Sequence, residues 1–336
     1  MGLSTVPAVP DLPGSITRDI ADALTTVLAP VGTPTRLELL TGGMFATTYR
    51  ATLTDGTRVI VKTAPTATDR LLTYELDLLR SEAQVYALAA DRPDLLMPQI
   101  LHEDFTRAVL PSDVLVVTHV PGVPMLDAGE LSAPVRARLH SDLGALMARL
   151  HTMHGDRFGY LNAASGLVAE TWPDAFGLMV GALLDDAARW GTPLPVDEVR
   201  AALVRHADAL AEITTPTLVH TDLWPGNLFI DPTTGELVGV IDTERSAWAD
   251  PLLELVGRDP FARTDPAADL LAAYESAGGR CELGTASGRT RFALYRMYLG
   301  LVMTVEIAPR AFAGDWLVAH RASVDVTLRD ALNELR

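Results

Sequence analysis

Apolar and polar positions in the first sixty residues predict one helix followed by three strands. Residues 15–28 place apolar side chains at helical spacing behind a capping serine, Ser15. Residues 37–53 read as two strands on either side of a glycine turn, and the next apolar run, 57–62, ends in a lysine. This order predicts the start of a small mixed α and β unit.

The remaining pattern predicts one more strand in this unit and then a mainly helical region. Residues 71–90 have the spacing of an amphipathic helix, and residues 114–120 form a continuous apolar strand. Short apolar runs at 217–219, 228–230 and 237–241 predict strands within the helical region. The helices expected there span 133–153, 172–190, 196–212, 251–257, 266–277, 285–307 and 314–335.

These elements predict an α+β chain with three parts. Residues 1–34 are expected to form a helical extension, 35–120 a small β-rich lobe, and 121–336 a mainly helical lobe. A length of 336 residues suits two lobes rather than one small module.

Composition narrows the classes of partner. A formal net charge of -16 argues against nucleic acid and anionic membranes as partners, and no apolar run approaches the length of a membrane span. The single cysteine, Cys281, excludes an internal disulfide and fits a reducing cytoplasm. We therefore expect a cytoplasmic protein, as a monomer or weak homodimer.

One basic residue differs in type from all the others in the chain. The chain has 26 arginines but a single lysine, Lys62, at the end of the strand 57–62. An ammonium is a compact charge that can contact two phosphates at once, which the planar guanidinium does less well. Lys62 is therefore predicted to pair with the α- and β-phosphates of ATP, held by a carboxylate on the next helix. Glu82 is the first candidate for that carboxylate, and Glu75, seven residues earlier on nearly the same helical face, is the alternative.

Three polar residues in the strand-rich part of the second lobe form the pattern of a phosphotransferase. Asp222 lies in the segment His-Thr-Asp-Leu-Trp-Pro-Gly-Asn, which ends at Asn227, and Asp242 follows an apolar strand. Asp222 is predicted to accept the proton of the attacking hydroxyl, while Asn227 and Asp242 offer hard oxygen ligands for Mg²⁺. Gly42 and Gly43, between two strands, are expected to expose backbone amides to the phosphates.

With these motifs the chain resembles the aminoglycoside phosphotransferase and choline kinase superfamily over about residues 35–330. The matching segments are Leu-Val-His-Thr-Asp-Leu-Trp-Pro-Gly-Asn at 218–227, Gly-Val-Ile-Asp at 239–242 and Ala-Asp-Pro-Leu at 249–252. The resemblance implies a bilobal, protein-kinase-like fold and the same roles for Asp222, Asn227, Asp242 and Lys62. It also implies an adenine-contacting hinge at 118–120, through backbone groups of Thr118 and Val120.

Two departures leave the acceptor open. Thr221 stands where many members have glycine, and Glu244 is similar to a glutamate of choline and methylthioribose kinases rather than to the aromatic of antibiotic kinases. The segment around Trp224 also resembles fructosamine kinases. A cationic antibiotic of the aminoglycoside type leads as acceptor, with ketosamine, sugar and amino-alcohol kinases as alternatives. From another class, a nucleotide-binding pseudokinase that regulates a partner remains an alternative.

The acceptor is expected to meet acidic side chains of the helical lobe. Glu244 and Asp186 are the candidate substrate carboxylates, and Trp172 is a candidate apolar wall. A convergence of several carboxylates would attract ammonium groups. The wider set of acidic candidates is Asp174, Asp185, Asp186, Glu244, Asp250, Glu254, Asp259 and Glu306.

Overall fold

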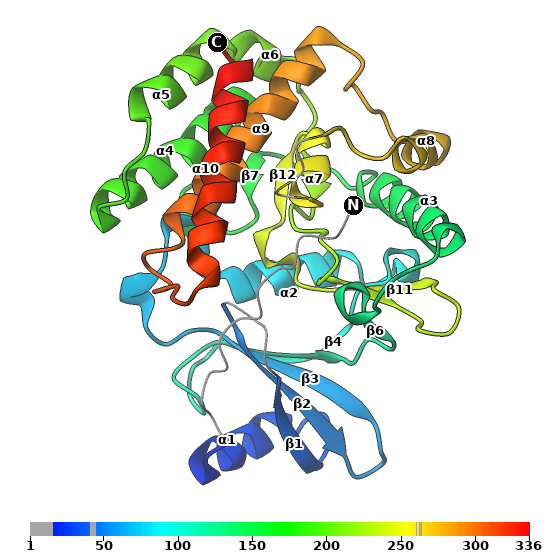
Figure 1. Ribbon diagram of the computed structural model, residues 1–336. Helices are drawn as coiled ribbons and strands as arrows, with labels where there is room; N and C mark the ends of the chain where they lie inside the picture. Colours follow the sequence, from blue (N-terminus) through cyan, green and yellow to red (C-terminus); the bar gives the residue numbers. More distant parts are fainter. Residues whose placement is uncertain (1–15, 41–44, 260, 262–263) are drawn as a thin grey trace.

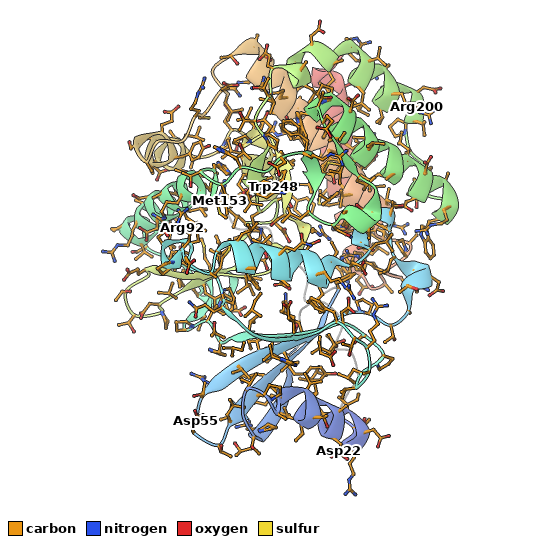
Figure 2. All side chains as sticks on the ribbon, turned by 180° about the vertical axis from the view of Figure 1, so that it is seen from behind. Asp22, Asp55, Arg92, Met153, Arg200 and Trp248 are labelled. Carbon is orange, nitrogen blue, oxygen red and sulfur yellow. The ribbon has the colours of Figure 1, made fainter. Side chains whose placement is uncertain are left out.

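The computed structural model describes residues 16–40, 45–259, 261 and 264–336 (Figure 1). A β-sheet formed by the first part of the chain lies at one end, and helices make up most of the other end. Figure 2 shows Asp22 and Asp55 at the tip of the small lobe, with Arg200 at the opposite end of the molecule. The predicted α+β class with two lobes is therefore confirmed. No helix in the described ranges combines the length and apolar character needed to cross a bilayer.

The small lobe contains one five-stranded antiparallel sheet in the order β1-β2-β3-β5-β4. Its strands are β1 (Pro34–Leu40), β2 (Thr47–Leu53), β3 (Arg58–Thr63), β4 (Ile100–Asp104) and β5 (Val114–Thr118). β4 was not predicted from the sequence, because His102, Glu103 and Asp104 give it little apolar character. The turn between β2 and β3 is made by Asp55, which accepts the Thr57 amide at 2.8 Å, and Gly56 at φ 85°.

Helices cover this sheet on two sides. α1 (Arg18–Leu28) buries Leu24, Val27 and Leu28 in one core with residues of β2, β3 and β5. The helix therefore shares the core of the small lobe. The division at residue 34 had instead implied a helical extension outside that lobe. Its N-cap is Thr17, whose hydroxyl accepts the Ile20 amide, whereas the predicted cap Ser15 lies outside the described residues.

α2 (Leu78–Leu88) packs between the sheet and the helical lobe (Figure 1). The prediction that this helix begins near residue 71 is wrong. Asp77 takes a left-handed conformation with φ 52°, and residues Thr73–Glu75 form a separate 3₁₀ turn before it. This break removes the shared helical face on which Glu75 and Glu82 had been expected to be interchangeable.

The large lobe is mainly helical and holds the largest apolar core. α9 and α10 pack side by side, as do α3 and α8. The predicted helix 196–212 is two helices, since His206 separates them. The helices are α3 (Ala133–Leu150), α4 (Trp172–Trp190), α5 (Val196–Arg205), α6 (Ala207–Ala211), α7 (Leu252–Gly257), α8 (Ala268–Ser276), α9 (Ala286–Val305) and α10 (Trp316–Glu334).

Short strands carry the polar motifs of this lobe. The first set, in the order β11-β10-β6, and the second, in the order β8-β7-β12-β9, are antiparallel. β9 leads into the 220–227 loop, β10 leaves it, and β11 leads to Asp242. The strands are β6 (Val123–Pro124), β7 (Phe158–Tyr160), β8 (Val168–Ala169), β9 (Thr217–Val219), β10 (Leu228–Ile230), β11 (Leu237–Val240) and β12 (Ala247–Ala249).

Candidate active site

Lys62 lies at the end of β3 and makes the central ion pairs of the site. Its Nζ lies 2.7 Å from both carboxylate oxygens of Glu82 and 2.7 Å from Oδ1 of Asp242. Burial opposes the ammonium charge, but Asp242 and then Glu82 outweigh it and hold the pKa of Lys62 well above its ordinary value. The chain's one lysine therefore joins the sheet, α2 and the large lobe.

Glu75 has a different role from Glu82. Its carboxylate accepts the Leu72 amide at 2.9 Å and pairs with Arg310 at 2.5 Å. Glu75 therefore fixes the turn before α2 to the C-terminal part of the large lobe, and the choice left open by the sequence falls on Glu82.

The 220–227 loop is held by hydrogen bonds from both sides. Nε2 of buried His220 lies 3.0 Å from the carbonyl oxygen of Ile241, and its Nδ1 accepts the Asp222 amide at 3.3 Å. The amide of Ile241 donates to the carbonyl oxygen of Asn227 at 3.1 Å. A neutral imidazole with the proton on Nε2 satisfies both His220 contacts. His220 thus organises the loop next to Asp242.

The start of the loop is set by Glu254 of α7. Its two carboxylate oxygens accept the amides of His220 at 2.7 Å and Thr221 at 2.9 Å. Thr221 has φ 66°, a conformation that costs little for glycine and more for a β-branched residue. Its hydroxyl donates to the Arg245 carbonyl at 2.9 Å. A glycine at this position could not form this hydrogen bond. A Cβ on Gly257 would lie 1.9 Å from the Thr221 carbonyl oxygen, so only glycine lets α7 approach the loop this closely.

Asp222 and Asn227 lie together at the end of this loop. The side-chain amide of Asn227 donates to the Asp222 carbonyl at 2.9 Å and to its Oδ2 at 3.2 Å. Burial raises the pKa of Asp222 to about 6, with Arg245 opposing the rise and Asp242 adding to it. Asp222 is therefore a carboxylate whose proton affinity is close to that of a base used near neutral pH.

Three carboxylates converge beside Lys62. Oxygens of Glu82, Asp242 and Glu244 all lie within 4.8 Å of one another. Burial, followed by the charge of Asp242, raises the pKa of Glu244 well above its ordinary value. Oε2 of Glu244 is buried and has no hydrogen-bond partner among the described residues. The oxygens of Glu244 and Asp242, with Oδ1 of Asn227, are a donor set that suits a hard divalent cation.

Comparison with known proteins identifies the family of the chain. The model of the phosphotransferase enzyme family matches residues 36–293, which include each of the residues described above except Arg310. The chain belongs to the phosphotransferase enzyme family. Membership of this family makes the chain an enzyme that transfers phosphoryl groups.

Solved structures of related fold agree over nearly the whole chain. A candidate aminoglycoside phosphotransferase from Ralstonia eutropha JMP134 is similar with a TM-score of 0.67 at 14% identity, covering 94% of this chain and 98% of that one. A candidate fructosamine-3-kinase from Thermobifida fusca YX-ER1 has a TM-score of 0.65 at 19% identity, covering 95% and 100%. The streptomycin–ATP–APH(2″)-IIa ternary complex has a TM-score of 0.60 at 15% identity, covering 95% and 99%. At these identities the likeness shows the fold that the phosphotransferase shares with them.

Only some of the backbone groups predicted to contact the nucleotide lie within the described residues of the phosphotransferase. Gly42 and Gly43 lie outside the described residues. The amide and the hydroxyl of Thr118 are both engaged with Gln99, each at 2.9 Å. The amide of Val120 has no hydrogen-bond partner in the part of the chain that the structure describes. Val120 therefore retains the hydrogen-bonding capacity expected of a hinge, whereas the Thr118 amide does not.

Two of the three predicted substrate residues are structural instead. Trp172 is fully buried, packs against Phe158 and Phe176, and donates to the Tyr295 hydroxyl at 2.8 Å. Asp186 accepts the Thr73 amide at 2.7 Å and pairs with Arg189 at 3.0 Å. The placement of Trp172 and Asp186 in an acceptor pocket is wrong because both side chains are occupied by contacts that hold α4 in place. The third, Glu244, lies with the carboxylates beside Lys62 rather than in an open acceptor cleft.

Three of the other acidic candidates, Asp250, Glu254 and Glu306, are also engaged within the protein, whereas Asp185 and Asp259 are exposed. Asp250 accepts from Arg291 and from the Tyr295 hydroxyl, both at 2.8 Å. Glu306 pairs with Arg245 at 3.2 Å and with Arg310 at 3.4 Å. Together with Glu254 on the loop amides, these contacts neutralise or occupy the carboxylates expected to attract a cation. Asp250, Glu254 and Glu306 therefore do not offer free carboxylates to an acceptor.

A depression next to the 220–227 loop has an aromatic wall. Its cavity volume is only about 20 Å³, and its lining includes Thr221, Arg245, Tyr74, Tyr160 and Tyr298. The guanidinium of Arg245 lies 5.6 Å from the centre of the Tyr74 ring, and the hydroxyls of Tyr160 and Tyr298 are hydrogen bonded to each other. Because Glu306 compensates the charge of Arg245, this surface is aromatic and nearly neutral.

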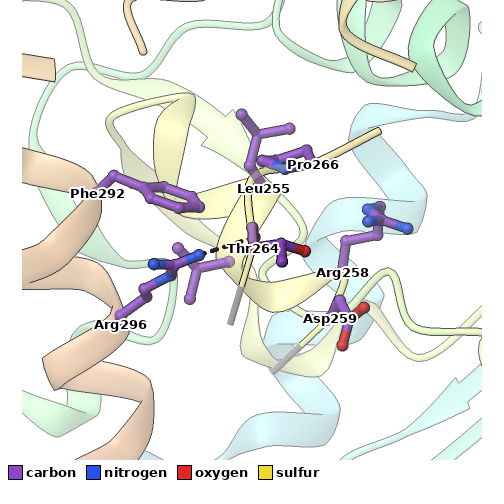
Figure 3. Close-up of a pocket in the computed structure, with 8 residues that line it drawn as sticks. Leu255, Arg258, Asp259, Thr264, Pro266, Phe292 and Arg296 are labelled. Atoms are coloured by element: carbon purple, nitrogen blue, oxygen red, sulfur yellow. Dashed lines mark hydrogen bonds between the residues drawn. The ribbon is translucent and has the colours of Figure 1, made fainter. Parts of the chain in front are cut away.

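A second depression lies between α7 and α9 (Figure 3). Its cavity volume is only about 10 Å³. Arg296 donates to the Thr264 carbonyl at 2.9 Å, and its guanidinium lies 4.4 Å from the Phe292 ring centre. None of the predicted catalytic or metal residues lines it. Arg296 ties two parts of the large lobe together here, and the reaction site lies elsewhere.

Proposed function

We propose that this phosphotransferase transfers a phosphoryl group from ATP to a hydroxyl of a small molecule. The observation that carries the proposal is the pairing of Lys62 with both Glu82 and Asp242 at 2.7 Å. It connects the cation expected at the phosphates with the carboxylate expected at the metal. The Asp222 loop is bonded to the neighbouring Ile241, so base, metal ligands and lysine lie in one site.

The residues present fit Mg²⁺ at this site. Asp242 and Asn227 are the proposed ligands, and the unpartnered, buried oxygen of Glu244 supports a third oxygen donor beside them. The bound cation would neutralise charge on the phosphate oxygens. Lys62 binds the α- and β-phosphates and is held in position by Glu82. Backbone groups of His119 and Val120 are proposed to contact the adenine.

Asp222 is proposed to orient the acceptor hydroxyl and take its proton. The Asn227 amide fixes the carboxylate from one side, which leaves its second oxygen for the acceptor. A pKa of about 6 leaves most of the Asp222 carboxylates ionised at pH 7 while keeping a useful proton affinity. A contribution to turnover of about 10²–10⁴ is typical of a base in this role.

The acceptor class follows from what faces the loop. The side chains that line the depression beside the loop, Tyr74, Tyr160 and Tyr298, are buried and uncharged, and Glu306 compensates the charge of Arg245. The pairing of Glu254 and Glu306 within the protein removes the electrostatic basis for preferring a polycation. We therefore place a neutral or singly charged hydroxyl compound, such as a sugar or ketosamine, ahead of an aminoglycoside.

A substrate panel tests this proposal. Purified protein with labelled ATP and Mg²⁺ is offered ketosamines, sugars, amino alcohols and aminoglycosides at low and high salt, with Asp222→Asn as the inactive control. Turnover of a neutral acceptor with little salt dependence is expected. A preference for aminoglycosides whose KM rises with salt would restore the cationic acceptor. Nucleotide binding without turnover of any acceptor would favour the pseudokinase.

A further inference from the structure

A buried phenol connects α2 to the backbone of the proposed metal ligand. The hydroxyl of Tyr86 donates to Oε1 of Glu82 at 2.6 Å and accepts the backbone amide of Asp242 at 3.2 Å. Tyr86 is 2% exposed, so solvent does not compete for either bond. A phenol has one proton and free lone pairs, so it can donate to the carboxylate and accept from the amide at the same time.

The position of this hydroxyl is fixed by packing. Tyr86 follows Glu82 by one helical turn, so the two side chains lie on the same face of α2. The Tyr86 ring belongs to a buried cluster with Leu115 and Val117 of β5. The small-lobe sheet therefore sets where the phenol meets Asp242, across 156 positions in the sequence.

Asp242 needs an anchor that does not involve its carboxylate. Its φ of 68° is unfavourable for a residue with a side chain and persists only where surrounding contacts impose it. Its carboxylate contacts Lys62 in this structure, but phosphotransfer requires Lys62 to bind phosphates and Asp242 to bind the metal. The bond from the Asp242 amide to Tyr86 is independent of that exchange of partners.

We propose that Tyr86 is a positioning residue that fixes the backbone of Asp242 to Glu82, so that the metal ligand keeps its place when Lys62 turns to the nucleotide. The inference rests on the proposed function for its consequence, since Asp242 acts as a metal ligand only there. The hydrogen-bonded link itself is a property of the protein without nucleotide. It makes the position of α2 part of the metal site.

The test compares Tyr86→Phe with a matched variant, Tyr295→Phe. Tyr295 is also fully buried, donates to a carboxylate (Asp250) and accepts an N–H (from Trp172), but lies away from Lys62. Each variant removes one hydroxyl and the same two kinds of hydrogen bond. A general loss of stability is therefore common to both, whereas an effect on Asp242 is expected only from Tyr86.

Two measurements distinguish positioning from a merely structural role. In the nucleotide-free protein, hydrogen exchange of the Asp242 amide is expected to accelerate about tenfold in Tyr86→Phe, the effect of losing one net hydrogen bond. By calorimetry, ADP is expected to bind about tenfold more weakly to this variant with Mg²⁺ and equally well without it. Tyr295→Phe is expected to match wild type in both measurements, although its melting temperature falls.

A third variant separates the phenol from the charge of its partner. Glu82→Gln retains a side-chain oxygen that accepts from Tyr86, so the Asp242 amide is expected to stay protected. Rapid exchange of the Asp242 amide in Glu82→Gln would overturn the positioning role. So would a Tyr86→Phe variant that equals wild type in both amide exchange and Mg²⁺-dependent ADP binding. If neither the wild-type protein nor any variant binds ADP, the proposed function fails. The exchange measurement then still tests the hydrogen bond between Tyr86 and the Asp242 amide.

Discussion

Replacing Asp222 by asparagine should stabilise the protein while removing its activity. Burial raises the pKa of Asp222 from 3.8 in a model peptide to about 6 in the folded chain. The native state therefore binds this proton more tightly than the unfolded state, and ionisation of Asp222 lowers stability as pH rises from about 4 to 6. The variant is nearly isosteric and keeps an oxygen that can accept from Asn227.

The expected gain in the free energy of unfolding of Asp222→Asn over wild type depends on pH. The rise of the Asp222 pKa from 3.8 to about 6 corresponds to about 3 kcal/mol at pH 7, to about half of that at pH 5 and to less than about 1 kcal/mol at pH 4. These are upper values because the Asp222 side chain is partly exposed and screened by solvent. The gain of the variant over wild type should therefore grow with pH and be nearly complete by pH 7.

Urea unfolding of the nucleotide-free protein at pH 4, 5 and 7 measures this difference. Asp231→Asn is the matched control, because the Thr234 and Thr233 amides lower the pKa of that partly exposed carboxyl and reverse the expected sign. Turnover of Asp222→Asn should fall by about 10²–10⁴. A stability gain that is the same at pH 4 and pH 7, or a variant less stable than wild type at pH 7, would refute the raised pKa of Asp222.

Other outcomes follow from the same contacts. The kcat/KM of wild type should fall about tenfold per pH unit below about pH 6, because only ionised Asp222 accepts the acceptor proton; an unchanged rate at pH 5 would assign the base elsewhere. Lys62→Arg should lose most activity, since a guanidinium cannot occupy the point 2.7 Å from both Glu82 and Asp242; equal ATP KM and turnover would contradict this. Asp242→Asn should weaken Mg²⁺-dependent ADP binding more than Asn227→Asp, because only the first change removes a charge; the reverse order by calorimetry would exchange their roles.

The polar motifs could be read from the sequence because their spacing is local. A loop of six residues holds Asp222 and Asn227 close together, and a two-stranded hairpin brings Asp242 back beside them. The single lysine at a strand end is visible without any knowledge of the fold. These features predicted the class of fold and the class of reaction, and the family match bears both out.

Local geometry decided what sequence spacing left open around α2. Glu75 and Glu82 are equivalent on a continuous helix, but the left-handed Asp77 breaks it and turns only Glu82 toward Lys62. The hydrogen bonds of Tyr86 had no sequence signal beyond its place one turn after Glu82. Both outcomes depend on how the small-lobe sheet packs against α2.

The expectation of an acidic acceptor pocket counted carboxylates without their partners. A net charge of -16 is a property of the composition, whereas the field at a site depends on which charges remain unpaired there. Arg291, Arg245 and Arg310 come from the C-terminal half of the chain and compensate acidic residues that sequence proximity could not assign to them. The sequence by itself determined the chemistry of phosphoryl transfer, since that chemistry resides in short motifs. Only the tertiary structure decided which of the acidic residues are compensated, because the ion pairs join segments far apart in the chain.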